Sequence, residues 1–259
     1  MSYERAQYGN IDLPPEVEVT HSQSALLDDI YPIDELRRVD ERTTFFRGRA
    51  ILCTRNDAAT KLNNMVLNNL GGPQAEEKVY ESADRVGDDD QGLGRELPPA
   101  YLASLSPSGI PPASLRLRKG TPVMLLRNLY AQHGLCNGTR LIVTQLLQRG
   151  VVARIDGGDY DGDVHFIPRI DCSTTEDDLP FKLFRRQLPL RLCFAMTINK
   201  AQGQTLQTVG VDLRSPVFSH GQLYVALSRV TDVRRLRVLL PDDGTRKTIN
   251  EVYEEVLIR

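Results

Sequence analysis

The sequence predicts an α/β domain that is interrupted by a small antiparallel β-structure. A buried strand is indicated by the apolar run at 50–54, and a helix by the spacing of apolar residues between Ala59 and Leu70. Short β-rich runs separated by turn signals then fill residues 119–190, as in a small barrel or meander. From residue 191 the strand–helix pattern returns. The chain is therefore expected to fold as one α/β domain with a β-barrel insertion.

The composition indicates a globular protein and excludes some classes. No apolar run approaches the roughly 20 residues that span a bilayer. The N-terminal residues lack the apolar core of a signal peptide, so neither membrane insertion nor secretion is expected. The four cysteines are far apart and form no C-x-x-C pair. They are predicted to be reduced and mostly buried, and no metal site is expected.

Net charge is −2, so the chain as a whole does not attract nucleic acid. Arginine and lysine nevertheless gather at 116–127, 182–191 and 229–247. Local basic surface can bind phosphate on a nearly neutral protein.

The first strand–helix unit has clear start and stop signals. Asn56 or Asp57 can cap the helix after strand 50–54, and the Gly-Gly-Pro at 71–73 ends it. Residues 1–48 are polar and irregular, with apolar points that predict one or two short helices. Residues 73–114 contain several glycines, prolines and Asp88-Asp89-Asp90, and little periodicity, so they are expected to be an irregular stretch.

The last third of the chain is expected to add three strands and two helices. The strands are LCFAM (192–196), VGVDL (209–213) and LRVLL (236–240). SHGQLYVALSRV (219–230) is predicted to be a helix, with Ser219 and Gln222 at capping-box spacing. Apolar residues at helical spacing from Ile249 to Leu257 predict an amphipathic helix at the C-terminus.

The segment TINKAQGQTL (197–206) directly follows a predicted strand, where open α/β sheets bind their ligands. Thr197 and Asn199 can donate hydrogen bonds to backbone phosphates, and Lys200 supplies a positive charge. Gly203 would let the main chain approach a phosphate closely. An equally good interpretation from chemistry alone is a polar loop with a helix cap.

Arg229 ends the predicted helix 219–230. Arginine is always charged and forks onto phosphate, so a rigidly held arginine suits an arginine finger at a γ-phosphoryl group. The alternative is the ordinary preference for a cation at a helix C-terminus.

Two other patterns argue against a metal or nucleotide cradle in this stretch of sequence. DGGDYDGD (156–163) resembles the start of a calcium loop, but Val164 stands where glycine is required and no glutamate closes the loop. It is predicted to be a solvated hairpin tip. No G-x-x-x-x-G-K-[ST] occurs, so neither a phosphate cradle nor a magnesium-binding strand end is evident.

Together these segments resemble the C-terminal half of Pif-type (superfamily 1B, RecD-like) DNA helicases, especially those encoded by Helitron transposons. AILCTRNDAATKLN resembles motif IV, AMTINKAQGQTL motif V and GQLYVALSRV motif VI. PSGIPPASLRLRKGTPVMLLRNL and GLCNGTRLIV resemble the entry to the family's SH3-like insertion. Asn199 stands where cellular relatives usually carry histidine and the transposon branch has asparagine; Arg55 replaces a common proline in motif IV.

The resemblance implies a second RecA-like lobe of an ATPase that unwinds DNA 5′ to 3′, with an inserted SH3-like 2B barrel. It places Thr197, Asn199 and Lys200 at the DNA, Gly203, Gln204 and Thr205 on the nucleotide side, and Arg229 as the finger. The implied divisions are a connecting segment (1–48), the first part of the lobe (49–118), the insertion (119–190), the second part of the lobe (191–241) and a C-terminal helix (242–259).

The partners implied are single-stranded DNA and a first RecA-like lobe carrying the P-loop, in cis or in trans. ATP and Mg²⁺ are expected in the full-length helicase only, with nothing tightly bound to this chain, which alone should be inactive. Repair, recombination, telomere maintenance or Helitron transposition are the implied settings, in the nucleus or mitochondria of a eukaryote. The alternative is a non-catalytic module that binds single-stranded DNA or a partner.

Overall fold

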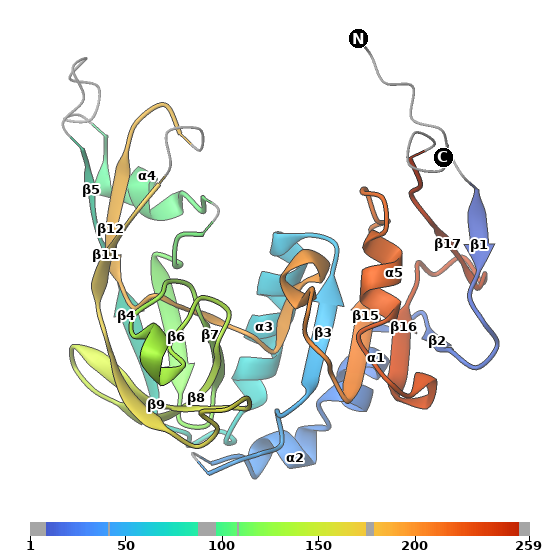
Figure 1. Cartoon of the computed structure of the whole chain (residues 1–259), viewed down its shortest axis with the longest axis horizontal. Helices are drawn as coiled ribbons and strands as arrows, with labels where there is room; N and C mark the ends of the chain where they lie inside the picture. The colour runs from blue at the N-terminus through green and yellow to red at the C-terminus, as the bar shows by residue number, and fades with distance from the viewer. Residues whose placement is uncertain (1–8, 41, 88–96, 108, 175–178, 254–259) are drawn as a thin grey trace. The chain divides into compact units, whose positions relative to one another are not determined.

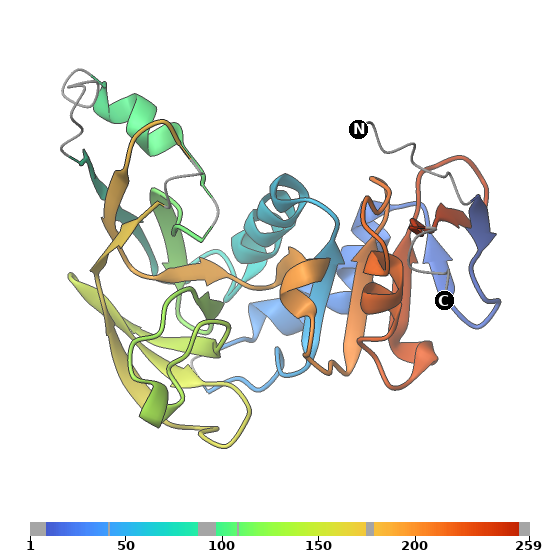
Figure 2. The same ribbon diagram turned by 45° about the horizontal axis from the view of Figure 1, so that its top comes forward.

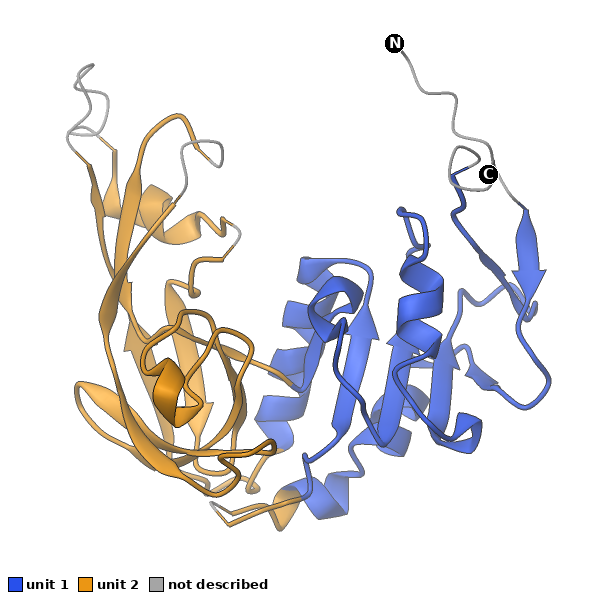
Figure 3. Cartoon of the chain, in the orientation of Figure 1, with its two compact units in different colours: residues 1–36, 45–69, 194–259 blue, residues 37–44, 70–193 orange. Residues whose placement is uncertain are grey.

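The computed structural model of the protein describes residues 9–40, 42–87, 97–107, 109–174 and 179–253. The chain forms two compact units (Figure 3): unit 1 is Met1–Leu36, Phe45–Asn69 and Phe194–Arg259, and unit 2 is Arg37–Thr44 and Leu70–Cys193. Within the described ranges, no helix is both long enough and apolar enough to cross a membrane.

Unit 1 is built on a five-stranded sheet of order β14-β3-β15-β16-β2, in which every neighbouring pair is parallel. Figures 1 and 2 show α1 and α3 on one face of this sheet and α5 on the other. The elements of unit 1, in chain order, are β1 (Asn10–Asp12), β2 (Glu18–Thr20), α1 (Gln23–Ile30), α2 (Ile33–Arg37, whose last residue falls in unit 2), β3 (Arg49–Cys53), α3 (Asn56–Asn69), β14 (Ala195–Thr197), the 3-10 turn η3 (Ile198–Ala201), β15 (Thr208–Asp212), α5 (Gln222–Leu227), the 3-10 turn η4 (Val233–Arg235), β16 (Leu236–Leu239) and β17 (Lys247–Ile249).

The central strands are continuous apolar runs because both of their faces are covered, as is usual in parallel sheets. Residues 50–53 of β3 are fully buried, and so are residues 209–212 of β15. Gly210 lies under α1: a Cβ there would come within 3.0 Å of side-chain carbons of Leu26 and Ile30. The missing side chain therefore lets α1 pack closely on β15.

The predicted strand–helix unit is confirmed in β3 and α3. The helix stops at two glycines in the left-handed region, Gly71 and Gly72, at φ of +67° and +74°. Asn63 is buried on α3, and its side-chain amide pairs with the main chain of Ala195: Nδ2 donates to the carbonyl oxygen (2.9 Å) and Oδ1 accepts from the N–H (2.8 Å). This pair fixes α3 beside β14.

The two chain ends differ from the prediction. β17 pairs antiparallel with β1, so residues 247–249 are a strand and not part of the predicted C-terminal helix; residues 254–259 lie outside the described part. Main-chain pairing with a segment more than 230 residues earlier overrides the local helical spacing. The N-terminal region is also more than a connection, because β2 is an edge strand of the sheet and Leu26, Ile30 and Tyr31 are buried in unit 1.

Unit 2 is made almost entirely of antiparallel β-structure. Its sheets have the orders β10-β9-β8-β7-β13, β11-β12-β5 and β4-β6. The predicted meander is confirmed, whereas the described strands do not close into a barrel. The elements are β4 (Glu77–Glu81), β5 (Ala83–Val86), α4 (Pro99–Ser104), β6 (Ser114–Arg118), β7 (Pro122–Leu125), the 3-10 turn η2 (Ala131–His133), β8 (Arg140–Leu146), β9 (Gly150–Ile155), β10 (Val164–Pro168), β11 (Ile170–Ser173), β12 (Leu183–Gln187) and β13 (Leu190–Leu192).

The boundary of unit 2 lies at Leu70, not at residue 119 as predicted, and the stretch 73–114 is not irregular throughout. Tyr80 of β4 and Leu115 and Leu117 of β6 belong to the same buried cluster as Val123 and Leu125 of β7. Strands β4 and β6 therefore share one core with the strands that follow. Asp88, Asp89 and Asp90 lie outside the described residues.

The longer segment of unit 2, Leu70–Cys193, is expected to be removable, and the short segment Arg37–Thr44 stays with unit 1 when it is replaced. The chain leaves unit 1 at the end of α3 and re-enters it at Phe194, beside the Asn63–Ala195 pair. We expect that replacing residues 71–192 with a short Gly/Ser linker will leave unit 1 soluble and folded, because domain insertions of this kind enter and leave at neighbouring points. Circular dichroism measures whether unit 1 remains folded, and amide hydrogen exchange measures the protection of β3, β15 and β16.

Replacing only residues 120–189 is the matched control. It removes the partners of Tyr80, Leu115 and Leu117 and should leave these side chains exposed, with aggregation or dye binding as the result. If the longer replacement unfolds unit 1 while the shorter one does not, the boundary at Leu70 is wrong.

Candidate nucleotide and DNA interface

The carboxyl edge of the parallel sheet brings three loops together. Thr197, Cys53 and Asp212 are the last residues of β14, β3 and β15, and they are direct partners in the sheet register. The segments after them therefore begin side by side. This is the edge at which open α/β sheets bind ligands.

The segment predicted to face DNA leaves β14 as the 3-10 turn η3. Ile198 and Ala201 are fully buried and anchor the turn, while Asn199 is exposed and Lys200 is half-buried. Thr197, at the end of the strand, is half-buried. The alternation leaves the amide of Asn199 and the ammonium group of Lys200 at the surface of a rigid turn.

The residues predicted on the nucleotide side follow directly. Gly203 has a φ of +80°, the left-handed region that favours glycine, and a Cβ there would meet nothing within 4 Å. Gln204 is half-buried and Thr205 is exposed. The side-chain amide of Gln204 donates to the carbonyl oxygen of Lys200 (3.1 Å), which closes the loop on itself.

Arg229 lies against this loop. Its Nη1 donates to the carbonyl oxygen of Gln204 (3.0 Å), its Nε to that of Val225 (2.8 Å) and its Nη2 to Oγ of Ser228 (3.0 Å). The carbonyl oxygen of Arg229 in turn accepts from the N–H of Leu206 (2.8 Å). The structure thus brings together the two polar segments that the sequence singled out.

Helix α5 is shorter than predicted, and the predicted capping box is wrong. The helix spans Gln222–Leu227, so Arg229 comes two residues after its end. Gly221 adopts the left-handed conformation (φ +73°) and makes Gln222 the first helical residue, too early for it to reach back to Ser219 as a capping box requires.

Gln222 instead joins two loops, a role that the sequence analysis missed. The residue is 3% exposed. Its Oε1 accepts from the N–H of Phe218 (3.0 Å), and its Nε2 donates to Oδ1 of Asn199 (3.3 Å). The sequence signal that could have indicated this role is a polar residue directly after a glycine, at a buried position of a helix. Gln222 orients Asn199 relative to the loop that follows β15.

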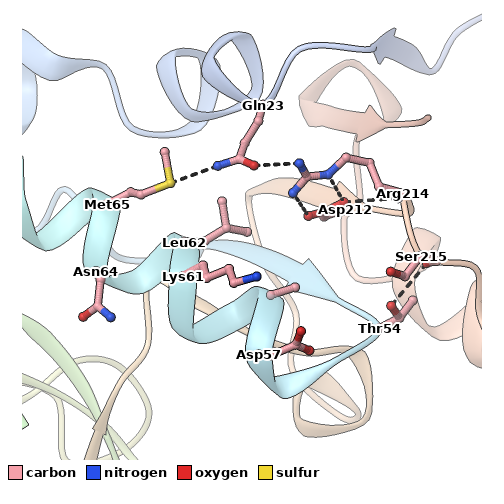
Figure 4. A pocket seen from close by; sticks show the side chains of 11 residues that line it. Gln23, Thr54, Asp57, Lys61, Leu62, Asn64, Met65, Asp212, Arg214 and Ser215 are labelled. Carbon is pink, nitrogen blue, oxygen red and sulfur yellow. Dashed lines mark hydrogen bonds and ion pairs between the residues drawn. The ribbon is translucent and has the colours of Figure 1, made fainter. Parts of the chain in front are cut away.

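A second set of polar contacts, which the sequence analysis also missed, lies at the carboxyl edge of the sheet beside α3 (Figure 4). Asp212 is buried at the end of β15 and pairs bidentately with Arg214 (2.7 Å from Oδ2 to Nη2). Nη1 of Arg214 donates to Oε1 of Gln23 on α1, whose Nε2 lies 2.9 Å from Sδ of Met65 on α3. These residues line a cavity of about 620 Å³ together with Asp57 and Lys61.

Burial at this edge keeps the thiol of Cys53 in its neutral form. Burial, and secondarily the carboxylate of Asp212, raises the pKa of the Cys53 thiol far above its usual range. The thiolate is the reactive form of cysteine, so Cys53 is a packing residue. All four cysteines are free, as predicted, and three are buried.

The described residues contain no group of three or more His, Cys, Asp or Glu side chains that could hold a metal ion. The 156–163 segment is the turn between β9 and β10, which confirms the predicted hairpin tip. Within it the N–H of Gly157 donates to Oδ1 of Asp161 (2.9 Å). The carboxylate of Asp161 thus stabilises the backbone of the turn.

Comparison with known proteins finds a matching family model, similar sequences and similar structures. Residues 100–146 match the family model "DNA helicase Pif1, 2B domain". Over 198 residues the chain is 34% identical to the ATP-dependent DNA helicase PIF1 of Xenopus laevis, covering 73% of this chain and 27% of that relative. A crystal structure of Pif1 helicase from Candida albicans superposes with a TM-score of 0.59 at 23% identity, over 91% of this chain and 53% of that one. Bacteroides Pif1 bound to single-stranded DNA gives a TM-score of 0.54 at 23% identity, over 91% of this chain and 50% of that one.

The mixed α/β fold is therefore that of Pif1 helicase structures with a 2B domain. The chain is homologous to the ATP-dependent DNA helicases of the Pif1 family. It spans about a quarter of the length of the curated relatives it matches.

Proposed function

We propose that this chain is the second RecA-like lobe and the 2B domain of an ATP-dependent helicase that moves 5′ to 3′ on single-stranded DNA. The observation that carries the proposal is the contact of Arg229 with Gln204 at the carboxyl edge of the sheet, since it joins the proposed arginine finger to the loop that carries Lys200. The Xenopus laevis relative is an ATP-dependent DNA helicase, and Bacteroides Pif1 is bound to single-stranded DNA in its structure.

The residues of this chain fit one side of an ATP site. Gly203 offers an open main chain, Gln204 and Thr205 offer polar groups, and Arg229 offers a guanidinium that stabilises charge on a γ-phosphoryl group. Bound Mg²⁺ would neutralise phosphate charge. The sequence printed here has no G-x-x-x-x-G-K-[ST] cradle, so the phosphates and the metal must be held by a first lobe, in the same chain or in a partner.

The 2B domain is proposed to correspond to unit 2, with an SH3-like sheet of β7 to β10. Asn199, which occupies the position where the Helitron-encoded branch has asparagine, favours that branch over the cellular helicases. Repair, recombination and transposition are the processes in which such an enzyme would act.

Single-stranded DNA should bind this chain weakly, without a strong sequence preference and with a steep dependence on salt. Each phosphate contact on a single strand contributes about 0.7 to the slope of log K against log salt. Lys200→Ala should lower that slope by nearly one such unit and weaken all sequences alike. Fluorescence anisotropy at several salt concentrations measures the slope.

Arg234→Ala is the matched control. Arg234 is highly exposed in η4, the turn that precedes β16, and therefore lies at the opposite, amino edge of the same sheet. The slope should not change in this variant although the same charge is removed. Equal slopes for the wild type and the Lys200 variant would show that DNA does not follow the carboxyl edge.

A further inference from the structure

A groove of about 1310 Å³ opens at the carboxyl edge of the sheet in unit 1. Its lining includes the apolar residues Val217, Phe218 and Ile249 and the polar residues 54–57 after β3. Its size exceeds the roughly 300–1,000 Å³ typical of pockets for small molecules. An open groove of this kind suits a length of polymer better than a single metabolite.

Phe218 is the unusual residue of this groove. Its side chain is 51% exposed, whereas the preceding Val217 is 3% exposed and anchors the loop in the core. The loop is further fixed because the N–H of Phe218 donates to the buried side chain of Gln222. An aromatic ring is thereby presented to solvent from a rigid backbone.

The same glutamine connects the groove to the proposed DNA contacts. Gln222 holds Oδ1 of Asn199 with its other side-chain atom, so Phe218 and Asn199 are joined through one residue. Phe218 and Asn199 therefore belong to adjoining loops at the edge of the sheet where the strand is proposed to bind.

The lining of the groove also contains a group that can read the edge of a base, Asn56. Asn56 is exposed, and within the described part of the chain its side-chain amide has no hydrogen-bond partner. An amide both donates and accepts, which matches the mixed edges of nucleobases. Aromatic rings stack with any base, because every base has a π-face.

We propose that this groove receives an unstacked nucleobase of the bound single strand, stacked on Phe218 and facing Asn56. The inference rests on the proposed binding of single-stranded DNA. It adds a base-contacting site to a surface whose other residues face phosphates. Binding energy at this point then comes from the base and not from charge.

The test compares a fluorescein-labelled oligothymidylate with an oligonucleotide of the same length that carries abasic sites, using anisotropy and the full 259-residue chain. Phe218→Ala should weaken binding of the oligothymidylate on the order of 5- to 150-fold, the range that corresponds to alanine substitution at a stacking residue. It should leave abasic DNA and the salt slope unchanged. Phe218→Tyr should restore binding because the ring is kept.

Tyr224→Ala is the control, since Tyr224 is 73% exposed on α5 but does not line the groove. Its oligothymidylate affinity should match the wild type. If Phe218→Ala weakens base-bearing and abasic DNA equally, or neither, while Lys200→Ala still lowers the salt slope, the base site is refuted and the proposed function stands. No binding of single-stranded DNA at all would overturn both proposals.

Discussion

Replacing Arg229 with alanine, in a protein that joins this chain to a matching first lobe, is expected to lower the kcat of ATP hydrolysis by about 10³-fold or more. That figure is the low end of the effect of arginine fingers on phosphoryl transfer. The guanidinium offers two parallel N–H donors to charge that develops in the transition state, and alanine offers none. Steady-state hydrolysis in the presence of single-stranded DNA measures kcat. The chain without a first lobe should hydrolyse no ATP.

The contacts of Arg229 dictate the controls. In this structure the guanidinium is held by the carbonyl oxygens of Gln204 and Val225, so alanine also removes a link between two loops. Ser228→Ala removes the third bond of the guanidinium, together with the bond from Oγ of Ser228 to the carbonyl oxygen of Val225, and should leave kcat nearly unchanged. Arg229→Lys keeps the charge without the fork and should remain strongly impaired, since the two residues are not interchangeable at such sites.

DNA binding separates a catalytic effect from a structural one. Arg229→Ala should bind single-stranded DNA with nearly wild-type affinity, because Lys200 and Asn199 are held by η3 and by Gln222. Wild-type turnover in the alanine variant, or hydrolysis by the isolated chain, would refute the assignment of the nucleotide side. Loss of DNA binding together with turnover would show that the Gln204 contact is structural.

Elements whose pattern is local could be predicted from the sequence. Strands β3, β15 and β16 are short apolar runs between polar loops, and their burial on both faces gives that pattern directly. Helix α3 has an apolar face and a glycine stop, both of which depend on neighbouring residues only. The segment with Asn199, Lys200 and Gly203 was found because it follows such a strand.

Elements that depend on pairing between distant segments could not be predicted from the sequence. The run LCFAM reads as one strand, yet its first residue, Leu192, ends β13 in unit 2, and Ala195 and Met196 lie in β14 of unit 1. One apolar run therefore serves two separate sheets. In the same way β4 has mostly charged or half-buried side chains, and its place in the core of unit 2 comes from pairing with β6.

The candidate site shows the same difference between local patterns, which the sequence predicts, and long-range contacts, which it does not. Sequence spacing gives the order of polar residues after each strand but not which loops touch. The contacts of Gln222 with Asn199, and of Arg214 with Gln23, join residues from different loops or elements. Such contacts follow from the parallel register of β14, β3 and β15, which no single segment encodes.

A buried ion pair in unit 2 is expected to dominate the stability of that unit. Arg185 of β12 is fully buried, and its guanidinium pairs with the carboxylate of Asp84 on β5 (2.7 Å from Nη2 to Oδ2). The remaining N–H groups donate to the carbonyl oxygens of Leu102, Leu105 and Pro111. All five donors of the guanidinium are thus satisfied, which is the condition for burying an arginine.

Asp84→Ala should destabilise unit 2 by about 3–5 kcal/mol, because it leaves the charge of Arg185 buried without a counter-ion. That is a large share of the roughly 5–15 kcal/mol that stabilises a typical domain. Amide hydrogen exchange read by mass spectrometry, with peptides from β5 and β12 followed separately from those of β3 and β15, assigns the loss to unit 2.

Asp171→Ala is the matched control in the same three-stranded sheet. Asp171 on β11 forms ion pairs at 3.7 Å with Arg186 of β12 and with Arg85 of β5, and the three side chains are 45%, 63% and 62% exposed. Water screens such a pair, so the change in the free energy of unfolding should stay within about 1 kcal/mol. If the two aspartate variants lose equal stability, burial is not what makes the Asp84–Arg185 pair important. If Asp84→Ala is as stable as the wild type, the guanidinium of Arg185 is held by the three carbonyl oxygens alone.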